Sequence, residues 1–119
     1  MTTEEVANRL VQLCRANKNI DAKIELYHDD IISIEPKGAP VEKAEGREAV
    51  LEKAKYWYNM LDEIHSTQIS DPITGGRFFS CTMKMDVTLK EHGRLLMDEL
   101  CIYEVKDGKI IYEQFFYDF

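Results

Sequence analysis

The spacing of apolar residues changes once along the chain, near Glu63, and this change limits the possible folds more than any other feature of the sequence. Before it, apolar residues recur every three to four positions, as in amphipathic helices. After it, apolar and polar residues alternate, as in strands that bury one face. The sequence therefore predicts an α+β fold, in which a cone-shaped, strongly curved mixed or antiparallel sheet wraps around three N-terminal helices.

The first two helices are predicted from their caps and their apolar spacing. Thr2 and Glu5 match a capping box, in which each side chain bonds the backbone N–H of the other residue. The first helix is expected to run to about Asn17, and Asn19 is expected to cap the second. The apolar side of the second helix is predicted to consist of Ile20, Ile24 and Tyr27.

A short strand and a third helix complete the N-terminal half. The strand is predicted over Ile31–Glu35, because Pro36 follows and cannot donate a ladder hydrogen bond. Residues 37–45 contain Gly38 and Pro40 and are expected to form a loop. The third helix then opens after Gly46, and its buried stripe is predicted to be Val50, Ala54, Trp57, Tyr58 and Leu61.

Four strands are predicted in the C-terminal half: Ile64–Ser70, Arg77–Leu89, Arg94–Lys106 and Lys109–Phe119. The last three are joined by two turns, each ending in glycine and each expected to be a three-residue hairpin loop. These loops would pair Lys90 with Arg94 and Val105 with Lys109. A two-residue second loop would instead turn the last strand over, so that its other face met the core.

With three-residue loops, odd-numbered positions on the last three strands face the core, because opposed residues share a face. The expected core face is Phe79, Cys81, Met83, Met85, Val87, Leu89, Leu95, Met97, Glu99, Cys101, Tyr103, Val105, Ile111, Glu113, Phe115, Tyr117 and Phe119. The opposite face is mixed on the first of these strands and apolar further along, with Leu100, Ile102, Tyr112 and Phe116. Such an apolar face outside the core predicts a contact surface.

Composition excludes several functional classes. The chain has 119 residues and a formal net charge of −7, with no basic run that could follow nucleic-acid phosphates. Its length predicts one domain over residues 1–119. Cys14, Cys81 and Cys101 show no metal-ligand spacing and indicate reduced thiols in a cytoplasmic protein. The absence of an apolar run of about 20 residues argues against a membrane span, and scattered histidines give no reason to expect a metal or a cofactor.

The order of elements and four short motifs resemble the nuclear transport factor 2-like superfamily, in its SnoaL-like and ketosteroid isomerase-like branch. The motifs are residues 26–30 (Leu-Tyr-His-Asp-Asp), Glu35-Pro36, residues 46–50 (Gly-Arg-Glu-Ala-Val) and residues 107–110 (Asp-Gly-Lys-Ile). The resemblance covers essentially the whole chain. It implies the fold strongly and the function weakly, because this superfold hosts isomerases, cyclases, dehydratases and non-enzymatic adaptors.

The resemblance to ketosteroid isomerase implies a general base but no oxyanion donors. Glu35 stands where that family places its catalytic carboxylate, whereas Leu10 and Cys101 stand where it places its two hydrogen-bond donors. The resemblance therefore does not predict steroid isomerisation by that mechanism. Asp118 stands near the position where SnoaL-like cyclases often carry an aspartate, but strand alternation predicts that it faces away from the core.

Three carboxyl groups are the candidate catalytic residues: Glu35, Glu99 and Glu113. The predicted register places Cys101 opposite Glu113 and makes Glu99 a neighbour on the same apolar face. Burial there would raise a carboxyl pKa and make the group useful as an acid or base near neutral pH. The alternative for Glu99 and Glu113 is that one or both pair with Arg15, Arg47 or a tyrosine, or lie at the wet rim of a cavity. The alternative for Glu35 is a solvated acid at the end of a strand.

The candidate ligand-binding residues are Tyr58, Trp57, Met83, Met85, Cys101, Tyr103, Phe115 and Tyr117. Their tyrosine hydroxyls could donate to a ligand carbonyl, or they could be ordinary core tyrosines. Trp57 and the methionines could equally be packing residues or the adaptable wall of a pocket.

Together these features predict a cytoplasmic protein with a pocket for a small hydrophobic molecule. It would be a cofactor-free isomerase, cyclase or dehydratase that acts on a hydrophobic carbonyl compound by carboxylate acid–base chemistry. The alternative is a non-catalytic dimeric ligand-binding or adaptor module.

The apolar outer face predicts a homodimer, because a monomer rarely exposes such a cluster. Sedimentation equilibrium at micromolar protein concentration should give about twice the monomer mass of 13.9 kDa. A monomer at that concentration would contradict the prediction.

Overall fold

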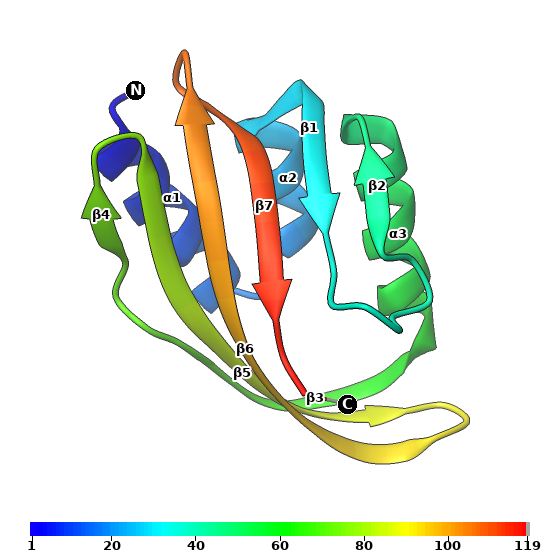
Figure 1. Cartoon of the computed structure of the whole chain (residues 1–119). Helices are drawn as coiled ribbons and strands as arrows, with labels where there is room; N and C mark the ends of the chain where they lie inside the picture. Colours follow the sequence, from blue (N-terminus) through cyan, green and yellow to red (C-terminus); the bar gives the residue numbers. More distant parts are fainter. Residues whose placement is uncertain (119) are drawn as a thin grey trace.

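A seven-stranded, unclosed mixed sheet curves around three helices in the computed structural model, which describes residues 1–118 (Figure 1). The helices are α1 (Thr3–Arg15), α2 (Asn19–Leu26) and α3 (Arg47–Met60). The strands are β1 (Tyr27–Ile34), β2 (Lys43–Glu45), β3 (Leu61–Ile69), β4 (Ile73–Gly75), β5 (Phe78–Leu89), β6 (Gly93–Lys106) and β7 (Lys109–Phe116). This is the α+β architecture expected from the change of apolar period.

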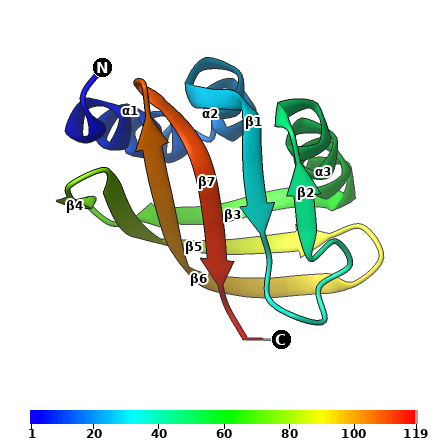
Figure 2. The ribbon, with the colours of Figure 1, turned by 45° about the horizontal axis from the view of Figure 1, so that its top comes forward.

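The sheet has the order β2-β1-β7-β6-β5-β3, and β4 pairs with β5 outside this path. All neighbours are antiparallel except β1 and β7, which run parallel. Figure 2 shows β5 and β6 bending beneath the helices, with β3 running across behind them. The helices lie on the concave side of the sheet, where α1 contacts β3 and β5, and α3 contacts β1 and β2.

The helix caps agree only in part with the sequence. The Thr2 hydroxyl accepts from the Glu5 N–H, and Glu5 Oε1 accepts from the Thr2 N–H, which confirms the capping box. The prediction that Asn19 caps α2 is wrong, because Asn19 is already the first helical residue and Lys18 precedes it without a side-chain cap. The predicted apolar side of α2 is wrong in part. Tyr27 is buried, although it begins β1, but Ile24 is exposed, and the buried residues of the helix are Ala22 and Leu26.

The segment before α3 is more ordered than predicted. Residues 43–45 form β2, which pairs with β1 from Ile32 to Ile34. The predicted loop over residues 37–45 is therefore wrong at its end. Three residues with no hydrophobic pattern gave no signal for a strand, and β2 is defined by its pairing rather than by its composition.

The second hairpin differs from the expectation in two ways that cancel. Its loop has two residues, Asp107 and Gly108, both with positive φ, as in a type I′ turn. Ile111 is then an extra residue in β7, because Val105 pairs with Ile110 while Glu104 pairs with Tyr112. This bulge restores the inward orientation that the shorter loop would have reversed. Ile110 replaces the predicted Ile111 in the core.

The predicted core face is confirmed on β5 and β6 except at one end. Its buried members there are Phe79, Cys81, Met83, Val87, Leu89, Cys101, Tyr103 and Val105. Leu95 is exposed, because β6 extends there beyond the end of β7 and away from the helices. Phe119, which was predicted to end the last strand, lies outside the described residues.

The outer face of β6 and β7 carries the expected apolar residues. Leu100 and Phe116 are directly opposed across the two strands and are 41% and 45% exposed. Ile102 and Tyr112 are half-buried. The homodimer predicted from this face stays a prediction.

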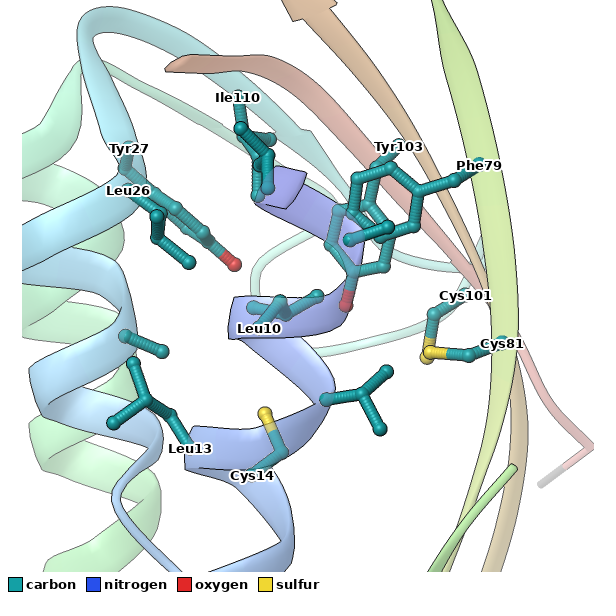
Figure 3. Close-up of a cluster of buried hydrophobic side chains, with 14 of the residues drawn as sticks. Leu10, Leu13, Cys14, Leu26, Tyr27, Phe79, Cys81, Cys101, Tyr103 and Ile110 are labelled. Carbon is teal, nitrogen blue, oxygen red and sulfur yellow. The ribbon is translucent and has the colours of Figure 1, made fainter. Parts of the chain in front are cut away.

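The first hairpin moves the cysteines relative to the expected register. Leu89 pairs with Gly93 instead of Lys90 with Arg94, so every partner across β5 and β6 shifts by two residues. Cys81 and Cys101 are consequently directly opposed, and the predicted diagonal placement is wrong. Figure 3 shows both side chains reaching into the core, across from Cys14 of α1. All three are free thiols and are buried.

We expect all three cysteines to remain reduced in the native protein and to react with a thiol reagent only after unfolding. Burial raises the pKa of the Cys14 thiol to about 11, which disfavours the reactive thiolate. Intact mass under non-reducing conditions, with thiol counts in native buffer and in denaturant, measures both points. A native mass lower by the two hydrogens lost on disulfide formation would contradict this prediction.

Candidate functional site

The interior of the sheet contains a buried carboxylate, Glu113, whose side chain has no exposed surface. It projects from β7, and the parallel pairing of β1 with β7 places Ser33 directly beside it. The Tyr27 hydroxyl donates a hydrogen bond to Glu113 Oε1, and the Ser33 hydroxyl donates to Oε2 at 2.7 Å. Both oxygens thereby accept a hydrogen bond, as a buried polar group requires. Of the structural alternatives for Glu113, pairing with a tyrosine is the one that the structure contains.

Two lysines that the sequence interpretation missed extend this cluster in opposite directions. Lys23 of α2 donates to the Tyr27 hydroxyl at 3.1 Å. Lys53 of α3 donates to the Ser33 hydroxyl at 2.8 Å and to Glu35 Oε1 at 3.3 Å. A signal for Lys53 was present, because it follows Val50 by three residues and precedes Trp57 by four, and so lies within the buried stripe of α3.

Glu35 follows β1 and is paired with Lys53, and the side chains of the two residues are 17% and 18% exposed. Burial raises the pKa of Glu35, while the Lys53 ammonium and a hydrogen-bonding interaction with Tyr117 act in the opposite direction. Its second oxygen, Oε2, is buried without a hydrogen bond of standard geometry among residues 1–118. Glu35 therefore has one oxygen held by a cation and one available to accept a proton.

Glu99 has a different environment from the other two carboxyls. It lies on β6 opposite Met83. Burial, followed by the negative charge of Glu35, raises the pKa of Glu99 from 4.5 to about 7. A carboxyl with that pKa is present in both protonation states near neutral pH, as a general acid or base requires.

A hollow of about 470 Å³ lies where β7 ends and β6 continues. It is lined by Pro36, Thr82, Asp98, Glu99, Leu100, Phe116, Tyr117 and Asp118. Two of the predicted site residues, Glu99 and Tyr117, therefore line the same hollow, whereas Glu35 and Glu113 are not among its lining residues. Asp118 lines the hollow together with Leu100 and Phe116 of the outer face, so the expectation that it faces away from the core stays a prediction.

The other predicted ligand-binding residues are distributed over the core and its edge. Tyr103 stacks on Phe79, with ring centroids 4.7 Å apart, and meets the edge of Phe115 at 6.3 Å. These rings fill the upper part of the interior together with Leu10, as Figure 3 shows for Tyr103 and Phe79. Cys101 is opposite Phe115, so its predicted pairing with Glu113 is wrong.

Trp57 and Tyr58 lie on α3, and Met83 and Met85 lie on β5. Burial raises the pKa of Tyr58 to about 12, with smaller contributions from Cys14 and Glu99. Trp57 is half-buried on α3, and Met83 is buried. Met85 contributes to a second hollow of about 280 Å³ on β3, β5 and β6.

Two further observations concern classes of site. Across the described part of the chain, no group of three or more His, Cys, Asp or Glu side chains is arranged to hold a metal ion. None of the helices formed by residues 1–118 is long and apolar enough to cross a membrane.

Comparison with known proteins identifies the family. The model of the SnoaL-like domain matches residues 1–117. The chain belongs to the SnoaL-like domain family. Comparison with curated protein sequences gives no match.

Solved structures of SnoaL-like and related proteins share the fold. One of them is a Mesorhizobium loti protein that is described as a candidate SnoaL-like polyketide cyclase and also as a carbohydrate phosphatase. It is 36% identical to this chain. The match covers 98% of this chain and 100% of that one, with a TM-score of 0.92. TerC, crystallised with polyporic acid, is 16% identical over 98% and 91% of the two chains, with a TM-score of 0.77. A Catenulispora acidiphila protein with a ketosteroid isomerase-like fold, in complex with trimethylamine, is 13% identical over 96% and 85%, with a TM-score of 0.75. The last two show the fold alone.

We expect the pH dependence of stability to report on Glu99. Its pKa is higher in the folded than in the unfolded state, so between about pH 4.5 and 7 the native SnoaL-like domain binds more protons than the unfolded chain. The free energy of unfolding should therefore decrease as the pH rises through that window. Urea unfolding at a series of pH values measures this decrease, and Glu99→Gln should flatten it.

Glu52→Gln is the control for this experiment, because Glu52 is an exposed glutamate on α3. It should leave the pH profile as in the wild type. If Glu99→Gln and Glu52→Gln give the same profile, the pKa of Glu99 is not raised by folding.

Proposed function

We propose that this SnoaL-like domain binds a small hydrophobic carbonyl compound and transfers a proton on it without a cofactor, as in an isomerisation, an aldol-type cyclisation or a dehydration. Glu35 is the base in this proposal. Glu99 and Tyr117 act as the acid or as groups that orient the substrate.

The observation that carries the proposal is the shared wall of the large hollow. Glu99 and Tyr117 both line a space of about 470 Å³, which is within the usual range for small-molecule sites. Glu35 directly precedes Pro36, another lining residue, and interacts with Tyr117. One of the three candidate carboxyls and a phenol therefore line a space that a ligand can enter, and Glu35 is connected to this space through Tyr117.

The three carboxyl groups suit different tasks because their surroundings differ. Glu35 has a free oxygen and a neighbouring cation, so it can accept a proton and return to its ionised state. The raised pKa of Glu99 supports donation of a proton near neutral pH. Glu113 accepts two hydrogen bonds and is fully buried, so we assign it a supporting role beneath the site instead of contact with the ligand.

The related Mesorhizobium protein supports the cyclase class, since it carries that description at 36% identity. Its second label names a different chemistry, so the reaction within the proton-transfer class is left to experiment.

A second candidate function is a non-catalytic ligand-binding or adaptor module. It is favoured by the filling of the upper interior, where Phe79, Tyr103 and Phe115 pack against one another. In such a module the remaining hollow would bind a ligand without changing it.

Hydrogen–deuterium exchange separates the two functions. We expect the protein to accelerate exchange at the carbon beside the carbonyl of small cyclic ketones and 1,3-dicarbonyl compounds in D₂O, measured by NMR. Glu35→Gln should reduce this acceleration by about a hundredfold or more, a typical contribution of a general base. Glu99→Gln should remove the dependence of the rate on an ionisation near pH 7.

The exposed-residue variant Glu52→Gln should retain the wild-type exchange rate. Binding of these compounds, seen as a change in Trp57 fluorescence, with no acceleration by the wild type would favour the module.

A further inference from the structure

Lys53 is the feature of the interior that the proposed proton transfer has not yet used. It lies on the buried side of α3, with its ammonium 5.7 Å from the centre of the Phe115 ring. Keeping an ammonium group away from water costs free energy unless partners compensate for it. The two hydrogen-bond partners of Lys53, Ser33 and Glu35, provide this compensation.

The orientation of the Ser33 hydroxyl fixes the position of the ammonium. A hydroxyl has a single proton, and Ser33 donates it to Glu113 Oε2, so toward Lys53 it acts as an acceptor. The fully buried Glu113 carboxylate thereby holds Lys53 in place through Ser33. The contact of Lys53 with Glu35 is longer, at 3.3 Å against 2.8 Å, so Glu35 is the more weakly held of the two partners.

The Lys53–Glu35 pair has both a free donor and a free acceptor. An ammonium has three N–H groups, and two are used within residues 1–118. Glu35 Oε2 has no hydrogen bond of standard geometry there. Neither residue lines the hollow of about 470 Å³, but Tyr117 lines it and interacts with Glu35. A substrate that reaches past Tyr117 from this hollow would meet a cationic donor and a carboxylate oxygen at once.

We propose that Lys53 is a catalytic residue that binds the carbonyl oxygen of the substrate and stabilises the negative charge developing on it, while Glu35 Oε2 takes the proton. This inference rests on the proposed function and adds the substrate class to it: a neutral carbonyl compound with an acidic hydrogen on the adjacent carbon. Glu113 and Ser33 are positioning residues for the ammonium.

The proposed step balances in atoms and charge. The C–H bond beside the carbonyl breaks and its proton moves to Glu35 Oε2. The electron pair of that bond forms a carbon–carbon double bond, and the carbonyl π pair moves to the oxygen, which gives an enolate. Lys53 then exchanges one anionic partner, Glu35, for another, the enolate oxygen, so no additional charge is created in the interior.

The same charges disfavour ligands that are already anionic. A carboxylate or phosphate ligand near Lys53 would also lie near the negative charge of ionised Glu35. Glu113 acts electrostatically on Glu35, and both Glu35 and Glu113 act on Glu99, so further acidic groups lie close by. Like charges at such distances repel. The site therefore selects neutral compounds that become anionic only by giving a proton to Glu35.

The test uses 4-nitrophenol, because only its phenolate form is yellow and binding can be followed by absorbance. At a pH where the free probe is the phenolate, wild-type protein should bind it with uptake of a proton by Glu35. Calorimetry in two buffers with different ionisation heats measures that uptake. Glu35→Gln should bind the phenolate about tenfold more tightly and take up no proton, because the competing carboxylate is gone.

Removing the ammonium should have the opposite effect. Lys53→Met should weaken phenolate binding by about tenfold or more, as expected for loss of a charge-assisted hydrogen bond. Lys55→Met is the matched control, since Lys55 is an exposed lysine on the same helix, and it should bind like the wild type. If Lys53→Met does not fold, Ser33→Ala, which removes the support of the ammonium, should weaken binding in the same direction.

Equal phenolate affinity of the wild type, Lys53→Met and Ser33→Ala would overturn the proposal. The proposal would also be overturned if the wild type bound the phenolate without taking up a proton and Glu35→Gln bound it with unchanged affinity. These are equilibrium measurements and need no turnover. Phenolate binding that depends on Lys53, without any deuterium exchange, would therefore reject the proton-transfer function and retain Lys53 as a binding residue. Deuterium exchange that does not depend on Lys53 would retain the proton-transfer function and reject the role of Lys53.

Discussion

The buried carboxylate of Glu113 is the constraint on which the interior depends. A carboxyl group with no exposed surface is tolerated only when hydrogen bonds replace its water, and Tyr27 and Ser33 provide them. Each hydroxyl also accepts from a lysine, Lys23 on one side and Lys53 on the other. A single carboxylate thereby connects α2, β1, β7 and α3, and this network places the second cation beside Glu35.

The three acidic residues show how environment divides one chemical group into different roles. Glu113 is saturated with hydrogen bonds, Glu35 shares a cation and keeps one oxygen unpaired, and Glu99 lies on an apolar strand face opposite Met83. Separation of the protonation behaviour of nearby carboxyls is the usual way in which a protein obtains an acid and a base from identical side chains. The proposed proton transfer depends on that separation more than on the position of any one residue.

The shape of the sheet determines where a ligand can enter. β6 extends to Gly93, whereas β7 ends at Phe116, so the lower part of β6 has no neighbour on that side (Figure 1). The large hollow lies at this step. The aromatic rings of Phe79, Tyr103 and Phe115 pack against one another in the core, and of the three candidate carboxyls only Glu99 lines the hollow.

The sequence by itself determined the fold class, the family and most of the core face. Alternation and helical spacing are local properties, so the amino-acid pattern alone was enough to place Phe79, Cys81 and Tyr103 inside. Glu99 and Glu113 could be singled out because a carboxyl within an apolar pattern is visible in the sequence, and Glu35 because of the resemblance to ketosteroid isomerase. The resemblance in turn depended on short motifs with fixed spacing.

Only the tertiary structure decided which side chains meet. The first hairpin has another register than the sequence predicted, and the loop of the second hairpin is one residue shorter than predicted. The bulge at Ile111 then restores the predicted orientation of β7, and no signature in the sequence indicates this bulge. Lys53 reaches Ser33 across 20 positions of the chain, and Ser33 reaches Glu113 across 80. Contacts between such distant positions depend on how β1 pairs with β7 and how α3 packs on them, and no local pattern contains that information.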